Sequence, residues 1–208
     1  MIKVGNSEGT FGLLVTKKIA GKAEPCLLSC FHVLCGDDLN DQYVDFNAST
    51  ASETKVTLGH SKIAEVVEGK LNGKIDGALA KITLPTLADP TIDHPYISAP
   101  KGGIMPIGQI HIDRPTTLYL CGGKTQHRRG VVRAYDTDAS IKFGLHVFKL
   151  EKLIVTERMS DKGDSGAAVF GEDGKIVGLL VADSKHKSYI QPIVPLISQL
   201  KFEINYLP

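Results

Sequence analysis

The chain lacks long hydrophobic runs and any excess of one sign of charge, and each absence excludes a class of protein. The longest uninterrupted apolar run, 176–182, is far shorter than the roughly 20 residues of a membrane-spanning helix. Residues 1–8 lack the apolar core of a secretory signal. The 24 basic and 23 acidic side chains give a net charge of +1, and the densest basic cluster is 127–129. We therefore expect a soluble protein with no membrane or nucleic-acid partner.

Cysteine is also scarce. The 208 residues include only Cys26, Cys30, Cys35 and Cys121, and the first three lie within ten residues. A secreted protein would instead use well-spaced pairs to close loops. We therefore expect free thiols in a reducing compartment, and so a cytoplasmic protein.

The hydrophobic fraction of 42% is enough to form a core, which excludes intrinsic disorder.

Short apolar runs rich in β-branched and aromatic residues recur along the chain, with Gly, Asp, Asn and Lys between them. Ten such runs predict an all-β barrel or sandwich. A helical period near the end predicts a short C-terminal helix at about 192–202, with Val194, Ile197 and Leu200 on one face. Pro195 fits this helix only because it falls in the first turn.

The chain changes character in its middle. Between 84 and 115, Pro occurs at positions 85, 90, 95, 100 and 106, and a Pro every few residues cannot lie within a central strand. This segment predicts a connection between two units, an N-terminal one at 1–98 and a C-terminal one at 99–208.

The strongest signal for chemistry is Lys162–Phe170, which reads Lys-Gly-Asp-Ser-Gly-Ala-Ala-Val-Phe. Ser165, between Gly163 and Gly166 and ahead of an apolar strand, is expected to expose its hydroxyl on a tight turn. An ordinary turn before a strand could have the same composition. As a nucleophile, a serine hydroxyl needs a base to remove its proton and an acid to orient that base.

His32 and Asp76 are the candidates for these two roles. Of the seven His, only His32 directly follows a buried-looking strand, and Asp76 begins another apolar strand. A histidine at a strand end is often structural, and an Asp at a strand start is often a turn or cap residue. Neither position alone indicates catalysis.

Taken together, these segments resemble the trypsin/chymotrypsin-like serine peptidases, and especially bacterial non-secreted members without the usual disulfides. Leu28–Leu34 is similar to the segment that bears the family's catalytic histidine, and Ile75–Lys81 to the strand that bears its aspartate. Gly163–Phe170 is similar to Gly-Asp-Ser-Gly-Gly-Pro-Val-Phe, and Gly9–Val15 to an early strand of the first barrel. The resemblance covers nearly the whole chain.

The resemblance implies two six-stranded antiparallel Greek-key barrels, packed perpendicular, with the active site between them. It also implies a serine endopeptidase that acts on polypeptides through a Ser-His-Asp triad and an acyl-enzyme. Ser165 would attack the carbonyl, His32 would take its proton and Asp76 would orient the imidazole. The N–H groups of Gly163 and Ser165 would form the oxyanion hole. No cofactor and no metal is expected.

The N-terminus departs from the pattern of the secreted members, in which a freed terminal amine pairs with the Asp before the nucleophile. The chain begins Met1-Ile2-Lys3, so we expect Asp164 to have another partner and activity to be independent of N-terminal cleavage. An oxyanion loop that orders only on partner binding is an alternative. Because no recognition domain follows the final helix, a regulatory protein could act in trans.

Three residues bear on substrate preference. Met159, six positions before the nucleophile, lies where the family has the floor of its specificity pocket, and Val181 falls in the pocket-wall strand, with Asp183 just beyond. A methionine offers no carboxylate to a basic side chain, so we expect an apolar or small residue before the scissile bond. Ordinary core packing of Met159 is the alternative.

Two other functions are open at this point. The chain could be an inactive member of the fold that serves as a protein-binding module. It could also be a metal-dependent regulator built on Cys26, Cys30, His32 and Cys35. On a strand, however, Cys26 and Cys30 would lie about 13 Å apart at ~3.3 Å per residue, too far for one zinc ion. Free cysteines in a core are the favoured interpretation.

Overall fold

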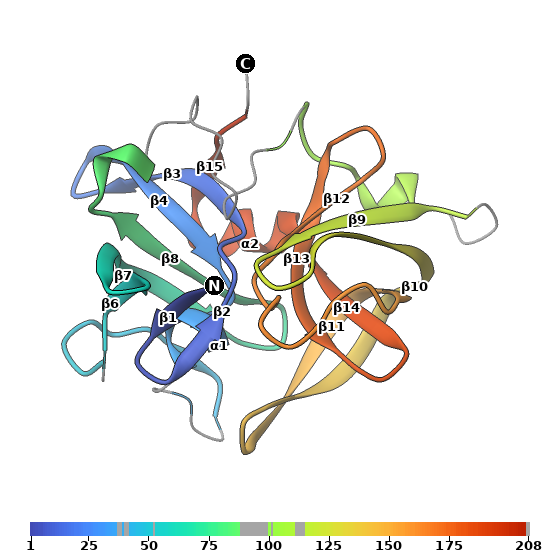
Figure 1. Ribbon diagram of the computed structural model, residues 1–208, viewed down its shortest axis with the longest axis horizontal. Coiled ribbons are helices and arrows are strands. Elements are labelled where there is room, and N and C mark those ends of the chain that lie inside the picture. Colours follow the sequence, from blue (N-terminus) through green and yellow to red (C-terminus); the bar gives the residue numbers. More distant parts are fainter. Residues whose placement is uncertain are drawn as a thin grey trace.

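Two β-rich halves lie side by side in the computed structural model, with the N-terminal half on the left of Figure 1 and the C-terminal half on the right. The structure describes residues 1–36, 39, 42–51, 53–87, 100, 102–110 and 115–206. The predicted boundary at 98/99 falls outside the described residues and stays a prediction.

The N-terminal half forms a nine-stranded antiparallel sheet in the order β15-β3-β4-β8-β7-β6-β1-β2, with β5 paired to β7. Its strands are β1 (Ile2–Val4), β2 (Ser7–Gly9), β3 (Leu13–Ile19), β4 (Lys22–Ser29), β5 (Val44–Asp45), β6 (Lys55–Leu58), β7 (Ser61–Leu71), β8 (Asp76–Ile82) and β15 (Phe202–Ile204). β15 pairs with β3, so the last described strand returns to the N-terminal sheet, although the predicted division groups it with the C-terminal unit.

The C-terminal half is a closed six-stranded barrel in the order β10-β11-β14-β13-β12-β9. Its strands are β9 (Thr117–Gly122), β10 (Gln126–Phe143), β11 (His146–Glu157), β12 (Ala168–Phe170), β13 (Ile176–Asp183) and β14 (Lys187–Pro192). The short helices are α1 (Phe31–Leu34), α2 (Ile193–Leu200), η2 (Pro85–Leu87) and η3 (Ile107–Gln109). The all-β double-barrel architecture with a short C-terminal helix is confirmed.

The prediction that places His32 at the end of a strand is wrong in detail. β4 stops at Ser29, and His32 lies in the single helical turn α1. Phe31, Val33 and Leu34 are buried in this turn, and Cys35 N–H closes it by donating to Phe31 O at 2.7 Å. Apolar periodicity cannot separate a buried strand end from a buried helical turn over so few residues.

α2 also buries a different face from the predicted one. Ile193, Leu196 and Leu200 are buried, whereas Val194 is 54% exposed. Ile197 packs at the edge of the cluster that contains the buried three. That cluster also contains side chains of β3, β4, β12 and β13. The helix therefore joins the two halves, and it lies between them in Figure 1.

β10 and β11 continue beyond the barrel as a hairpin whose residues 139–150 we call the arm. Its register runs from Ala139↔Leu150 to Phe143↔His146, and its end projects at the bottom of Figure 1. The inward side chains of the arm belong to the same hydrophobic cluster as α1 and the N-terminal sheet: Ile141, Phe143, Phe148 and Leu150. The arm therefore crosses from the C-terminal barrel to the N-terminal half.

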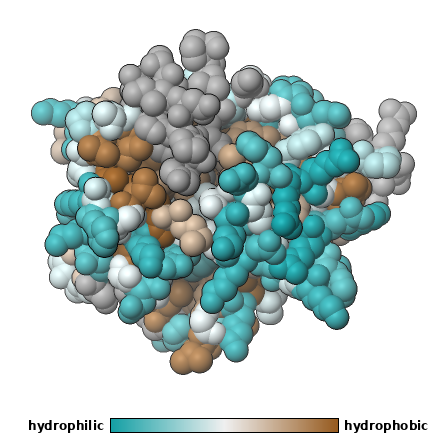
Figure 2. All heavy atoms as spheres, in the orientation of Figure 1, coloured by the Kyte–Doolittle hydropathy of each residue, from teal (hydrophilic) through white to brown (hydrophobic). Residues whose placement is uncertain are grey.

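Polar side chains cover most of the right-hand part of the face in Figure 2, and apolar ones gather on the left, over the N-terminal half. Among the described helices, none has the length and apolar character that crossing a bilayer requires.

Candidate active site

His32 and Asp76 form a partly buried hydrogen-bonded pair. His32 Nδ1 lies 2.6 Å from Asp76 Oδ2, and the His32 backbone N–H donates to Asp76 Oδ1 at 3.1 Å. Asp76 is fully buried, whereas the His32 side chain is 14% exposed. Because an ionised carboxylate only accepts hydrogen bonds, we assign the proton to Nδ1. The second ring nitrogen, Nε2, is then left to accept a proton.

Strand pairing explains why these two residues meet. Ser29 of β4 pairs with Ala78 of β8, so Asp76, the first residue of β8, lies beside the residues that follow Ser29. A side chain of the other barrel completes the contact. Gln191 of β14 accepts from the Asp76 N–H at 2.9 Å and donates to the Asp76 carbonyl at 2.5 Å. The backbone of Asp76 is therefore fixed from both halves.

Ser165 lies on the turn before β12, as the sequence predicts, and is partly exposed. Gly166, with φ +88°, has no room for a side chain, because a Cβ there would lie 2.5 Å from Thr10 O and would collide with Ser29 Oγ. A left-handed φ in so confined a place requires glycine.

Thr10 ties this turn to the N-terminal half. Its N–H donates to Ser165 O at 2.8 Å, and its carbonyl accepts from Ser29 Oγ at 2.7 Å. Its hydroxyl donates to Gly163 O at 2.9 Å and accepts from the Gly123 N–H at 3.0 Å. A single buried threonine therefore links the candidate nucleophile turn to the end of the strand that leads to His32.

A second junction lies next to it. The carbonyl of Leu180 accepts from both the Gly166 N–H, at 2.8 Å, and the Cys30 thiol, at 3.3 Å. Cys30 is two residues before His32, and Gly166 directly follows Ser165. The segments that carry the candidate base and nucleophile thus converge on one carbonyl oxygen between the barrels.

Asp164 has backbone partners, in agreement with the expectation that it pairs with something other than a terminal amine. Its carboxylate accepts from the N–H groups of Lys124 and Thr125, at 2.8 and 3.1 Å, and of Asp161, at 2.9 Å. Asp164 is fully buried, and charge-assisted hydrogen bonds of this kind are the strong ones. They hold the loop before Ser165 against the 122–125 turn.

The backbone around Gly163 and Ser165 offers two donors. Gly163 has φ +104°, and its carbonyl is held by Thr10. Within the described part of the chain, neither the Gly163 nor the Ser165 N–H donates to an acceptor. These two N–H groups are the candidate donors of the predicted oxyanion hole.

Two of the three predicted specificity residues lie in the core, and the third, Asp183, lies at an exposed position. Met159 and Val181 are both fully buried, Met159 in the cluster of the C-terminal barrel and Val181 in the cluster shared with the N-terminal half. Asp183 lies 3.5 Å from the guanidinium of Arg158, next to Met159 in the chain. Burial raises the pKa of the Asp183 carboxyl, and the charge of Arg158 opposes that rise.

One cluster among the described residues has ligand atoms close enough for a metal ion: Cys30, His32 and Asp76, within 4.8 Å of one another. Burial, and then the neighbouring Asp76, raises the pKa of the Cys30 thiol well above its ordinary value, whereas a metal takes the thiolate. The imidazole and the carboxylate already bond each other. Cys26 packs in a different cluster, so the four-residue metal set does not assemble.

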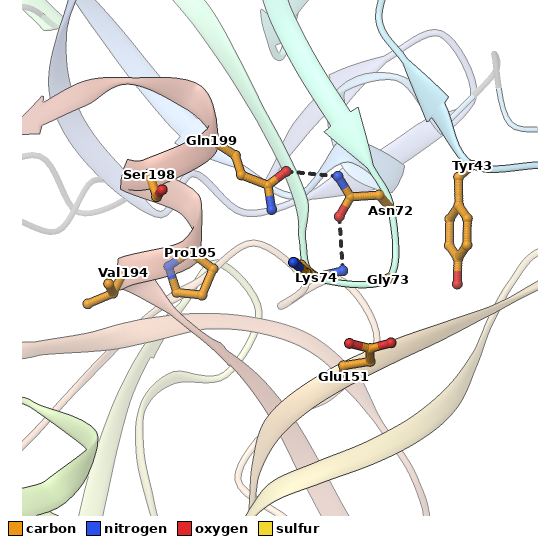
Figure 3. Close-up of a pocket in the computed structure, with 9 residues that line it drawn as sticks. All are labelled: Tyr43, Asn72, Gly73, Lys74, Glu151, Val194, Pro195, Ser198 and Gln199. Carbon is orange, nitrogen blue, oxygen red and sulfur yellow. Dashed lines mark hydrogen bonds between the residues drawn. The ribbon is translucent and has the colours of Figure 1, made fainter.

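A pocket of about 820 Å³ adjoins the turn that leads to Asp76. In Figure 3 this turn, the helix α2 and the strand β11 surround it, and Asn72 bonds both Gln199 and the Lys74 N–H. Its lining residues are Tyr43, Asn72, Gly73, Lys74, Glu151, Val194, Pro195, Ser198 and Gln199.

Sequence reasoning missed several residues of this site. Thr10 bonds Ser29, Gln191 bonds Asp76 and the ring of Phe143 stacks on His32. These contacts join distant segments, and no local pattern marks Gln191 or Phe143. Thr10 lies in the segment similar to an early family strand, but nothing in that segment indicates its hydroxyl.

Known structures share this arrangement of strands. Thermobifida fusca protease A superposes with a TM-score of 0.68 at 15% identity, covering 99% of this chain and 96% of that one. Cellulomonas bogoriensis chymotrypsin gives 0.64 at 13%, covering 99% and 96%. Nocardiopsis protease (NAPase) gives 0.62 at 14%, covering 96% and 98%. The fold is that of the chymotrypsin-like serine proteases.

Sequence comparison alone does not reach this result. No protein-family model matches the chain, and no curated protein matches it. At identities of 13–15%, the likeness to the serine proteases establishes the fold alone.

Proposed function

We propose that the chain is a serine endopeptidase that hydrolyses polypeptides with Ser165, His32 and Asp76 as its catalytic triad. The observation that carries the proposal is the 2.6 Å contact between His32 Nδ1 and the buried Asp76 carboxylate, in a fold shared with serine proteases. The glycine-flanked Ser165 supports it, because its carbonyl is bonded to Thr10, which also bonds Ser29 in the strand before His32.

In the acylation step, Ser165 Oγ bonds to the carbonyl carbon of the scissile peptide, and its proton passes to His32 Nε2. The N–H groups of Gly163 and Ser165 stabilise the oxyanion, a contribution worth about 3–4 kcal/mol per donor in such sites. The C–N bond then breaks, and the leaving amine takes the proton from His32. Asp76 stays ionised and balances the charge of the imidazolium.

Water completes the cycle. It bonds to the acyl carbon while His32 Nε2 takes one of its protons, and the acyl–Oγ bond then breaks as that proton returns to Ser165. The products are a carboxylic acid and the free enzyme. The imidazole and the His32 backbone N–H pair with the negative charge of the fully buried Asp76 carboxylate throughout the cycle. Without these partners, the buried charge would be strongly destabilising.

For the residue before the scissile bond, we retain the expectation of an apolar or small side chain, with Met159, Val181 and Asp183 as the determinants. The proximity of Arg158 to Asp183 supports this expectation. The positive charge of Arg158 offsets the negative charge of Asp183, which would otherwise attract a basic side chain of the substrate.

Three further points belong to the proposal. The four cysteines are free thiols, three of them buried, which supports a reducing, cytoplasmic location. A bacterial origin and a regulatory protein that acts in trans are proposed from the sequence alone.

Cleavage of a mixed peptide library by the purified chain tests the proposal. Ser165→Ala and His32→Ala should each reduce kcat/KM by about 10⁴-fold or more. Ser198→Ala and His60→Ala, at exposed positions, are matched controls that should cleave like the wild type. A folded wild-type chain that cleaves nothing, or a Ser165→Ala variant that cleaves normally, contradicts the proposal. The first result would favour a binding module.

A further inference from the structure

The arm places an aromatic ring directly on the candidate base. The rings of Phe143 and His32 are stacked, with centroids 4.1 Å apart and planes inclined by 9°. His32 belongs to α1 of the N-terminal half, whereas Phe143 is the last residue of β10 in the C-terminal barrel. Phe143 is buried in the same cluster as the side chains of α1. The stack is thus a packed contact between the two halves.

Two hydrogen bonds, one to the arm and one from the residue that follows it, fix the arm in this position. The Tyr43 hydroxyl donates to Lys149 O at 2.8 Å, and the Glu151 N–H donates to Gly73 O at 2.8 Å. Both partners on the N-terminal side lie outside α1, so the arm is attached to that half independently of its contact with His32. The arm that carries Phe143 is therefore held in place by contacts other than the stack on His32.

The hydrogen bond to Asp76 holds the imidazole only at its Nδ1 edge. One such bond leaves the ring free to tilt and turn about that edge, which would move Nε2 away from its working position. A parallel ring at 4.1 Å removes that freedom. The negative face of a benzene ring also attracts a cation, so Phe143 favours the imidazolium that the reaction forms.

We propose that Phe143 is a positioning residue, which fixes the plane of the His32 ring from the opposite barrel and stabilises its charged form. The expected effect of Phe143 on kcat rests on the proposed function, whereas its effect on the orientation of the His32 ring does not.

The test compares the same substitution at two sites in the arm. Phe143→Leu removes the stacked ring, and Phe143→Met is a second aliphatic variant of nearly the same volume but with an unbranched, more flexible side chain. Phe148→Leu is the matched control, because Phe148 is buried in the same arm and meets Phe143 and Tyr43 but not His32. Phe143→Tyr keeps an aromatic ring at this position, unlike the other two variants.

Two readouts are measured on each variant: kcat and KM on a cleaved peptide, and the downfield proton NMR signal of His32 Nδ1–H. The aliphatic variants at 143 should lower kcat by about 3- to 30-fold, from the strength of a ring–cation contact, with KM within about twofold. They should also broaden or remove the Nδ1–H signal. Phe148→Leu should leave both readouts near wild type, and Phe143→Tyr should recover most of the loss.

Equal effects of Phe143→Leu and Phe148→Leu on both readouts would overturn the positioning role while leaving the peptidase intact. A wild-type chain that cleaves nothing, but whose Nδ1–H signal is lost only on substitution at Phe143, would overturn the proposed function and support the positioning role. An unchanged Nδ1–H signal in both aliphatic variants would overturn the inference whatever the activity.

Discussion

Replacing Thr10 by Val tests how the nucleophile turn is held. Valine has nearly the shape of threonine and keeps the backbone bonds of residue 10 to Ser165 and Ser29. It removes only the hydroxyl, which bonds Gly163 O at 2.9 Å and the Gly123 N–H at 3.0 Å.

The expected loss follows from these two partners. A buried polar group left without its partner costs about 1–3 kcal/mol. Gly123 and Gly163 are only partly buried, so water can replace part of what is lost. We therefore expect T10V to lower the free energy of unfolding by about 1–3 kcal/mol in total. Because the Gly163 carbonyl is no longer fixed, kcat should fall by about tenfold, less than the 10²–10³ for loss of a whole oxyanion donor.

The assay combines urea unfolding with kcat and KM on a chromogenic peptide, measured where every variant is folded. Thr16→Val is the matched control, because the Thr16 hydroxyl bonds Asn205 at 2.8 Å, at the edge formed by β3 and β15. It should lose stability but keep kcat, and Thr10→Ser should keep both. Full kcat in a destabilised T10V, or equal losses of kcat in T10V and T16V, would refute the role given to this hydroxyl.

Two further predictions concern thiols and pH. In the native protein near pH 8, a disulfide reagent should label about one thiol quickly, Cys121, because burial raises the pKa of Cys26 to about 12 and encloses Cys30 and Cys35. All four should react in denaturant, and a second fast thiol in the native state would contradict the structure. Burial raises the folded-state pKa of Asp183, so its contribution to stability is full below the unfolded value of about 3.9 and is lost as pH rises through the folded value. In urea unfolding, the free energy of unfolding of Asp183→Asn should therefore fall less than that of the wild type as pH rises through this range. A larger fall in the variant would contradict the prediction.

The sequence predicts those parts of the site that depend on local patterns. A serine flanked by glycines ahead of an apolar strand, and an aspartate at the start of another, are legible because turns and strand starts have local chemistry. Ser165 and Asp76 lie on such elements. His32 is found by its buried neighbours, although they form a helical turn and not a strand end.

The rest depends on pairings between distant residues. Thr10 contacts Gly163 across 153 positions, and Gln191 contacts Asp76 across 115. No local period encodes such contacts, since they exist only once two barrels pack together. The stacking of Phe143 on His32 is of the same kind, because it depends on the length of the hairpin and on the bulges in its register. The return of β15 to the N-terminal sheet is invisible for the same reason.

Intact-mass analysis after treatment with a fluorophosphonate tests the triad most directly. We expect one adduct per folded chain, mapped by peptide sequencing to Ser165 and absent in both Ser165→Ala and His32→Ala. A folded wild-type chain that stays unmodified under conditions that saturate a known serine protease, or an adduct that persists in Ser165→Ala, would contradict it.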